Sequence, residues 1–126
     1  MAEYQEKLYD SEIIPGPDDL VAGASAFTGK ISVKAAGEYS RGEIMMRSGS
    51  EFVKGTVEGL SSASELCILC KNMTLVDGVT AEVYGYFMGA YNTKRVKLNG
   101  ELLTDYTEEE IASVIEALRK HKIFMR

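Results

Sequence analysis

The chain has 126 residues, 45% of them hydrophobic and 26% charged, which fits one soluble globular domain rather than two. No apolar run approaches the about 20 residues of a membrane-spanning helix, and the acidic start is unlike a signal peptide, so we expect a product made in the cytoplasm. The net charge is −5, and no cluster of Lys and Arg could neutralise phosphates, which argues against nucleic acid or an anionic membrane as partner.

Residues 1–29 differ from the rest of the chain. They carry six acidic residues and one lysine, whereas residues 30–126 hold 13 acidic and 13 basic residues, so the whole charge excess lies in this segment. It also contains both prolines, shows no sustained periodicity and includes three apolar islands at 8–9, 13–14 and 20–21. Two interpretations are open: a frayed terminus, or an arm that orders on a partner by pairing at a sheet edge.

The first half of the remaining chain reads as β structure. Residues 30–34 alternate polar and apolar side chains and predict a strand, and AGEY at 36–39 predicts a turn. A second strand is expected over 42–46, followed by a four-residue turn at 47–50. A third strand then runs through 51–54 and continues at 56–57, which completes a hairpin.

The second half continues the β pattern. A loop at 61–64 precedes a buried strand at 66–70, and Asp-Gly at 77–78 is a turn. Residues 80–91 form the longest strand candidate, and both of its faces are partly apolar, which suggests packing on two sides or an oligomer contact. One face carries Ala81, Val83, Gly85, Phe87 and Gly89, and the other carries Glu82, Tyr84, Tyr86, Met88 and Ala90. Residues 95–98 predict a short edge strand, closed by the Asn-Gly turn at 99–100.

One helix is expected, near the C-terminus. Thr107 and Glu110 have the spacing of a capping box, and the apolar stripe that follows is helical. The last four residues, IFMR, are expected to dock as a short strand. The predicted fold is therefore mainly β with one C-terminal-region helix (α+β), made of a flexible arm at 1–29 and a compact domain at 30–126.

Two cysteines, Cys67 and Cys70, have the CxxC spacing of a redox dithiol or half a zinc site. Their flanks have strand character, and positions i and i+3 of a strand face opposite sides, so the sulfurs would not meet. A structural zinc needs four ligands, and His121 is the only histidine in the chain. We therefore expect buried, inert thiols, and the alternative of a thiol-active enzyme stays open to an alkylation test.

Other catalytic patterns are poorly supported. His121 lies among cations just past the predicted helix, and the chain has neither a Gly-x-Ser-x-Gly elbow nor a phosphate-binding Gly-rich loop. Glu108 to Glu110 are explained by helix capping, and strand tyrosines such as Tyr84 are explained by packing. The residues predict no enzyme, no cofactor and no metal, and favour binding or assembly as the role of the domain.

The order of these elements resembles the head decoration proteins of tailed phages, of the lambda type. The stretches that carry the resemblance are 19–23 (DLVAG), 30–36, 36–44 (AGEYSRGEI), 48–52 (SGSEF), 67–69 (CIL), 78–89 (GVTAEVYGYFMG) and 118–124 (LRKHKIF). In that order they look like the family's arm-to-body junction, first strand, turn and next strand start, second turn, short buried strand, long strand, and helix with terminal strand. The Cys67 to Cys70 run departs from the small Gly-containing sequences expected there.

The resemblance implies a β-clip-like fold and a homotrimer bound to the major capsid protein. Such trimers sit on the outer surface of the virion, at the local three-fold axes of the expanded head, and stabilise it against the pressure of packaged DNA. The family's N-terminal arm pairs with capsid strands. We therefore expect Tyr9, Ile13, Ile14 and Pro15 to contact the capsid, together with Leu20 and Val21. The alternative is a small β adaptor that binds another protein partner.

Overall fold

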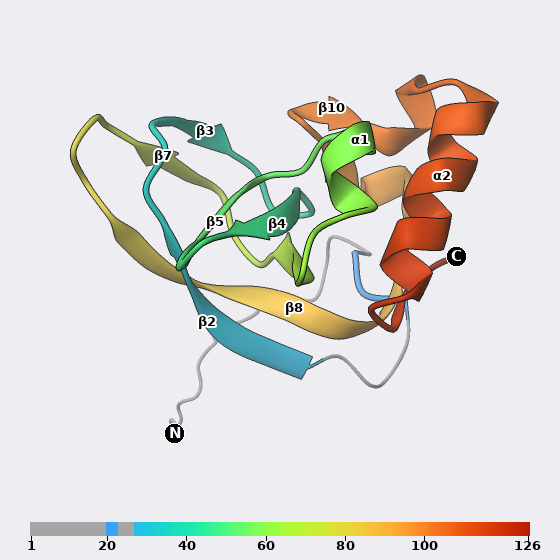
Figure 1. Cartoon of the computed structure of the whole chain (residues 1–126), viewed down its shortest axis with the longest axis horizontal. Helices are drawn as coiled ribbons and strands as arrows, with labels where there is room; N and C mark the ends of the chain where they lie inside the picture. Colours follow the sequence, from blue (N-terminus) through green and yellow to red (C-terminus); the bar gives the residue numbers. More distant parts are fainter. Residues whose placement is uncertain (1–19, 23–26) are drawn as a thin grey trace.

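The computed structural model describes residues 20–22 and 27–126, and this part of the chain is mainly β with two α-helices (Figure 1). The strands are β2 (Phe27–Val33), β3 (Gly37–Tyr39), β4 (Ile44–Ser48), β5 (Glu51–Lys54), β6 (Leu66–Leu69), β7 (Met73–Leu75), β8 (Ala81–Tyr91), β9 (Lys97–Leu98), β10 (Glu101–Leu102) and β11 (Ile123–Met125). The helices are α1 (Val57–Leu60) and α2 (Glu108–Arg119), with 3-10 turns η1 (Thr93–Arg95) and η2 (Leu103–Asp105).

Five strands close into a small barrel. Their order is β8-β2-β5-β4-β6, and β6 pairs back onto β8 through Ile68 and Leu69. Four of the five junctions are antiparallel, whereas β2 and β5 meet in parallel at one residue pair, Val33 and Phe52. That single pair makes the β2–β5 junction the thinnest part of the barrel wall.

The barrel interior is filled by side chains that recur at every second residue of the strands, as the pleat requires. We call this set the barrel core: Ile31, Val33, Tyr39, Met45, Phe52, Cys67, Leu69, Leu75 and Val83. Gly85 faces the same interior, because a Cβ added there would lie 2.7 Å from the Cys67 Sγ atom. The absence of a side chain at Gly85 is therefore what makes room for the Cys67 sulfur.

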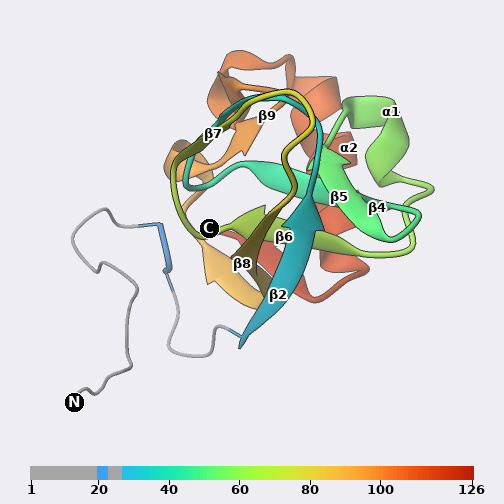
Figure 2. The same ribbon diagram turned by 90° about the vertical axis from the view of Figure 1, so that its left-hand side faces the viewer.

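A second apolar cluster lies outside the barrel, where α2 packs against α1 and β11. We call it the helix core: Leu20, Ile44, Leu60, Leu66, Ile68, Cys70, Tyr86, Tyr91, Val96, Leu98, Leu103, Val114, Ala117, Leu118 and Ile123. Figure 2, seen from the β3–β7 end, shows α2 behind the barrel strands. Because successive residues of β6 alternate between the two cores, all four of its side chains are buried.

The capping box predicted for α2 is present. The Thr107 hydroxyl accepts from the Glu110 backbone N–H at 3.2 Å, and the Glu110 carboxylate accepts from the Thr107 backbone N–H at 3.1 Å. The predicted terminal strand is β11, which runs parallel to the end of β8. The Asn99-Gly100 turn is also confirmed, and its positive φ angles of 53° and 84° suit a type I′ hairpin turn.

The long strand β8 is confirmed, but its alternation is broken once. The register with β2 passes from Met88 to Tyr86 and skips Phe87, which forms a bulge. A bulge inserts one residue, so the side chains beyond it exchange faces. As a result Tyr91, not Ala90, joins Tyr86 in the helix core, and their rings lie 5.4 Å apart. The predicted face that grouped Ala90 with Tyr86 is wrong for this reason.

Several predicted boundaries are wrong. The turn expected at 36–39 contains strand β3, which pairs with β7, a strand the sequence pattern had not indicated. The hairpin turn after β4 has two residues, not four, because Ser48 pairs with Glu51. The strand expected at 56–57 is instead the start of α1, since the Thr56 hydroxyl accepts from the Gly59 N–H and caps a helix. In the edge strand expected at 95–98, Arg95 is the last residue of η1, and only Lys97 and Leu98 form the strand β9.

Candidate functional site

The junction between the expected arm and the body lies on β8. The Ala22 N–H donates to the Ala90 carbonyl at 2.9 Å, and the Asn92 N–H donates to the Leu20 carbonyl at 2.8 Å. Val21 forms an antiparallel bridge with Tyr91. Residues 20–22 therefore pair antiparallel with β8, as β2 does. Residues 20–22 and 27–29 were expected in the arm, and here they pair with β8.

The expected contact residues divide at this junction. Leu20 is 1% exposed and belongs to the helix core, so its side chain packs within the domain itself. Val21 is half-buried against the same core, which leaves only part of it for a partner. Tyr9, Ile13, Ile14 and Pro15 lie outside the described residues.

An exposed apolar surface, which we call the strand-end patch, consists of Phe27, Met88 and Phe124. Phe27 pairs with Met88, and Phe124 pairs with Ala90 two residues further along β8, so the three side chains share one face of three adjacent strands. Their exposed fractions are 60%, 37% and 41%. The patch is not apparent from the sequence, because Phe27 falls in the stretch expected to be the arm. One part of it could have been predicted: in the last strand, Phe124 lies between Ile123 and Met125, and an alternating strand that buries those two residues turns Phe124 outward.

A second exposed apolar surface, which we call the turn patch, lies on the turn between β7 and β8. Val76 is 63% exposed and Val79 is 44% exposed, and the Val79 N–H donates to the Val76 carbonyl at 3.3 Å. Asp77 and Gly78 form the predicted turn between them, where Gly78 has a φ of 82°. The turn predicted at Asp77-Gly78 is therefore confirmed, whereas the exposed surface formed by Val76 and Val79 was not predicted.

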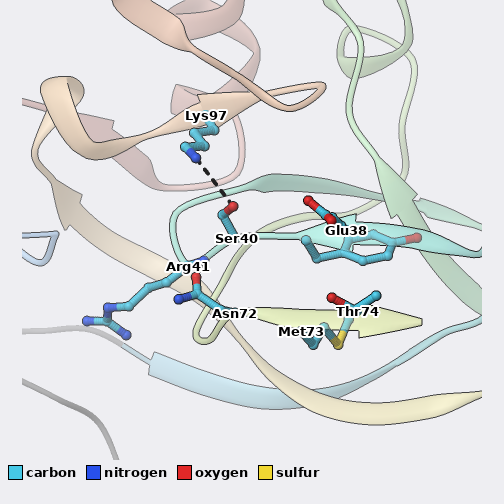
Figure 3. Close-up of a pocket in the computed structure, with 8 residues that line it drawn as sticks. Glu38, Ser40, Arg41, Asn72, Met73, Thr74 and Lys97 are labelled. Atoms are coloured by element: carbon cyan, nitrogen blue, oxygen red, sulfur yellow. Dashed lines mark hydrogen bonds between the residues drawn. The ribbon is translucent and has the colours of Figure 1, made fainter. Parts of the chain in front are cut away.

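A polar groove of about 660 Å³ opens beside the β3–β7 pair (Figure 3). Its lining residues are Glu38, Tyr39, Ser40, Arg41, Asn72, Met73, Thr74 and Lys97. The Lys97 Nζ atom donates to the Ser40 Oγ atom at 3.3 Å, which Figure 3 shows as a dashed line. The Arg41 guanidinium donates to the Cys70 carbonyl at 2.7 Å and to the Tyr86 hydroxyl at 3.1 Å, so it is used in joining the groove wall to the helix core.

One carboxylate is buried between the barrel and the β9–β10 hairpin. Glu43 is 1% exposed, and its Oε2 atom accepts from the Gly100 N–H at 3.0 Å. Burial raises the pKa of the Glu43 carboxyl, while the Gly100 hydrogen bond and the charges of Lys54 and Lys97 partly oppose that rise. This arrangement explains the group structurally: it holds the type I′ turn against the start of β4.

The two thiols are buried and free, as expected. Cys67, in β6, lies in the barrel core, and Cys70, directly after β6, lies in the helix core, so the two side chains point to opposite sides as expected. Burial raises the pKa of the Cys67 thiol well above its usual range. Burial also raises the pKa of Cys70 to about 12, although the nearby Arg41 charge opposes the shift. Both thiols are therefore protonated at neutral pH, which disfavours nucleophilic chemistry.

Within residues 20–22 and 27–126, no group of three or more His, Cys, Asp and Glu side chains is placed to hold a metal ion. Among the same residues, the helices are too short or too polar to cross a bilayer. No protein-family model matches the chain, and no curated protein matches it in sequence. The candidate functional surfaces are therefore the junction at 20–22 and the two apolar patches.

Proposed function

We propose that the chain is a phage capsid decoration protein. In this proposal it binds as a trimer to the major capsid protein, on the exterior of the expanded head at the local three-fold axes. There it stabilises the shell against the pressure of packaged DNA. The role is structural and uses no cofactor, and neither nucleic acid nor a membrane is a partner.

The observation that carries the proposal is the attachment of residues 20–22 to β8. The resemblance to decoration proteins assigns the arm-to-body junction to residues 19–23, and the described part of that stretch is hydrogen-bonded to Ala90 and Asn92. Leu20, to which residues 1–19 are joined, is therefore held at a fixed point beside the longest strand. A fixed exit point is what an arm needs in order to reach a defined place on a neighbouring capsid subunit.

The arrangement of strands supports the β-clip-like fold that belongs to the same proposal. β2 and β8 pair antiparallel, and beyond a break at 34–36 and 76–80 the same two stretches of chain pair again as β3 and β7. Together they form a long, bent two-stranded ribbon, which Figure 1 shows running from β2 and β8 up to β3 and β7.

Trimer formation would solve an energetic problem of such an arm. Ordering each residue costs roughly 1–2 kcal/mol of backbone entropy, so a single arm binds weakly. When three arms are joined through one trimer, the second and third docking events become intramolecular, and avidity offsets the ordering cost. Expansion of the head moves the capsid strand edges to which the arms would bind. Arms held at one spacing by the trimer would therefore engage expanded heads only.

The test is co-sedimentation of the purified chain with expanded and unexpanded heads of a phage that encodes it. We expect saturable binding to expanded heads alone, in multiples of three per local axis. A variant with Tyr9→Ser, Ile13→Ser and Ile14→Ser keeps the length and charge of the arm and should lose binding. A matched variant with Glu3→Gln and Glu6→Gln changes the charge but keeps the apolar islands, and should bind.

Absence of binding to both kinds of head would overturn the proposal. Binding that persists unchanged after the three serine substitutions would remove the arm from the mechanism. A small β adaptor for another protein would then become the better hypothesis.

A further inference from the structure

The strand-end patch and the turn patch lie at opposite ends of the molecule. Met88 is seven residues from Ala81, at which β8 emerges from the turn patch, and this separation corresponds to about 23 Å of strand. Figure 1 shows the β7–β8 turn at one end of the long axis and the C-terminus towards the other. The two patches are also made of different side chains, aromatic residues with Met88 in one and valines in the other.

The chain segments that carry Phe124 and the two valines have opposite net charges. Residues 119–126, which lead into and through β11, carry four Lys or Arg residues and no acidic residue. His121 and Lys122 line a hollow of about 240 Å³ that also includes Met88, so this basic segment borders the strand-end patch. The one acidic residue that lines the hollow, Glu65, is paired with Arg47 at 2.6 Å. Residues 76–82, which contain the turn patch, carry Asp77 and Glu82 and no basic residue. Both acidic side chains are exposed.

We infer that copies of this chain associate head to tail, with the strand-end patch of one copy packed against the turn patch of the next. Each contact buries apolar side chains in its centre and sets a basic rim against an acidic one, which gives both affinity and orientation. Because the two surfaces differ and lie far apart on one protomer, the contact is heterologous. Such contacts close into rings when the rotation between copies allows it. That the ring has three members rests on the proposed function.

A second copy fits these surfaces better than an unrelated partner because the chain supplies both halves. A two-fold dimer through the strand-end patch alone would bring Lys122, which borders that patch, towards the Lys122 of the other copy, and like charges at a contact are unfavourable. The head-to-tail arrangement removes that repulsion and covers both patches in the same step.

The inference is tested by sedimentation velocity of the full chain, from low micromolar to about 100 µM. The wild type should self-associate. Phe124→Glu and Val76→Lys should each weaken association by about tenfold or more, which corresponds to about 1.4 kcal/mol per contact. Leu102→Lys is the matched control, because Leu102 is exposed on β10 outside both patches and should leave association unchanged.

Mixing the two variants distinguishes head-to-tail contact from other arrangements. Phe124→Glu retains an intact turn patch and Val76→Lys retains an intact strand-end patch, so an equimolar mixture holds one unsubstituted pair of surfaces. We expect a heterodimer in the mixture at concentrations where each variant alone is monomeric. Thermal unfolding of each variant checks its fold, and Phe27→Glu replaces Phe124→Glu if the latter unfolds.

A wild type that stays monomeric over the whole range would overturn the inference. So would loss of association in Phe124→Glu combined with none in Val76→Lys, because that result indicates a two-fold contact. Failure of the mixture to form heterodimers has the same consequence. The proposed function is tested separately: a chain that binds expanded heads but fails these experiments keeps the function and loses the head-to-tail contact.

Discussion

Gly85 is the position at which the barrel core tolerates least additional volume. In Gly85→Ala the new methyl group would start 2.7 Å from the Cys67 Sγ atom and 3.2 Å from the Cys67 Cβ atom. Both contacts are well inside ordinary van der Waals separations. Cys67 is 0% exposed within a closed ring of strands, so its side chain cannot move out of the way.

The expected cost follows from two opposing effects. Inserting a methyl group into a packed core costs about 1–3 kcal/mol. Replacing a strand glycine by alanine recovers about 0.5–1 kcal/mol of backbone entropy. The net loss in free energy of unfolding should therefore be about 1–2 kcal/mol, and it should shrink by at least about 1 kcal/mol when Cys67→Ala removes the sulfur.

Urea unfolding of the two single variants and the double variant measures this coupling. Gly29→Ala is the matched control, because its Cβ would meet the half-buried Phe87 ring at 3.0 Å, and its cost should not depend on Cys67. A Gly85→Ala variant as stable as the wild type would refute the reasoning. Equal cost in the presence and absence of the sulfur would also refute it.

Three further predictions concern single groups. The pKa of Glu43 is raised by burial, so its contribution to stability is largest below the unfolded value of about 4.5 and is lost as pH rises through the folded value. Glu43→Gln should therefore gain stability relative to wild type as the pH rises above about 4.5, measured by denaturant unfolding at several pH values. Cys67 and Cys70 should resist iodoacetamide in the native chain and react on unfolding, and rapid native labelling would revive a thiol-active enzyme. Thr107→Ala should cost about 1 kcal/mol of unfolding free energy, whereas Thr107→Ser should restore most of it, and equal losses would contradict the cap.

Elements encoded by neighbouring residues could be predicted from the sequence. The capping box of α2, the Asn99-Gly100 turn and the buried run of β6 each depend on side chains a few positions apart. Neighbouring residues are enough to indicate their physical causes, which are hydrogen bonds to free backbone groups, positive φ angles and burial on both faces. The mainly β class followed from these elements taken together.

Features that depend on distant pairings could not be predicted. The Phe87 bulge arises from the register between β2 and β8, and no residue near Phe87 indicates it. Helix α1 has only four residues, so a strand-like reading of Thr56 and Val57 was equally compatible with the pattern. Barrel closure depends on β6 returning to β8, a contact between segments about 17 residues apart.

The candidate site shows the same limit. An apolar pair such as Leu20-Val21 within an acidic segment suits either a partner or the domain's own core, and only the fold decides between them. In the structure the Leu20 side chain lies in the helix core, and its carbonyl accepts from the Asn92 N–H at the end of β8. The strand-end patch was equally hidden, since Phe27, Met88 and Phe124 come from three distant parts of the chain.

The crowding of partners on the last residues of β8 has a mechanical consequence. Residues 20–22 bond to Ala90 and Asn92, while β11 bonds to Gly89 and Tyr91. A pull applied at residue 19 therefore enters the body through β8, whose opposite edge is already held by the terminal strand. The hydrogen bonds that resist such a pull lie at the end of β8 far from Ala81, which pairs with Val33 beside the single-pair junction with Phe52. The thinnest part of the barrel wall is thus separated by the length of β8 from the bonds that meet the load first.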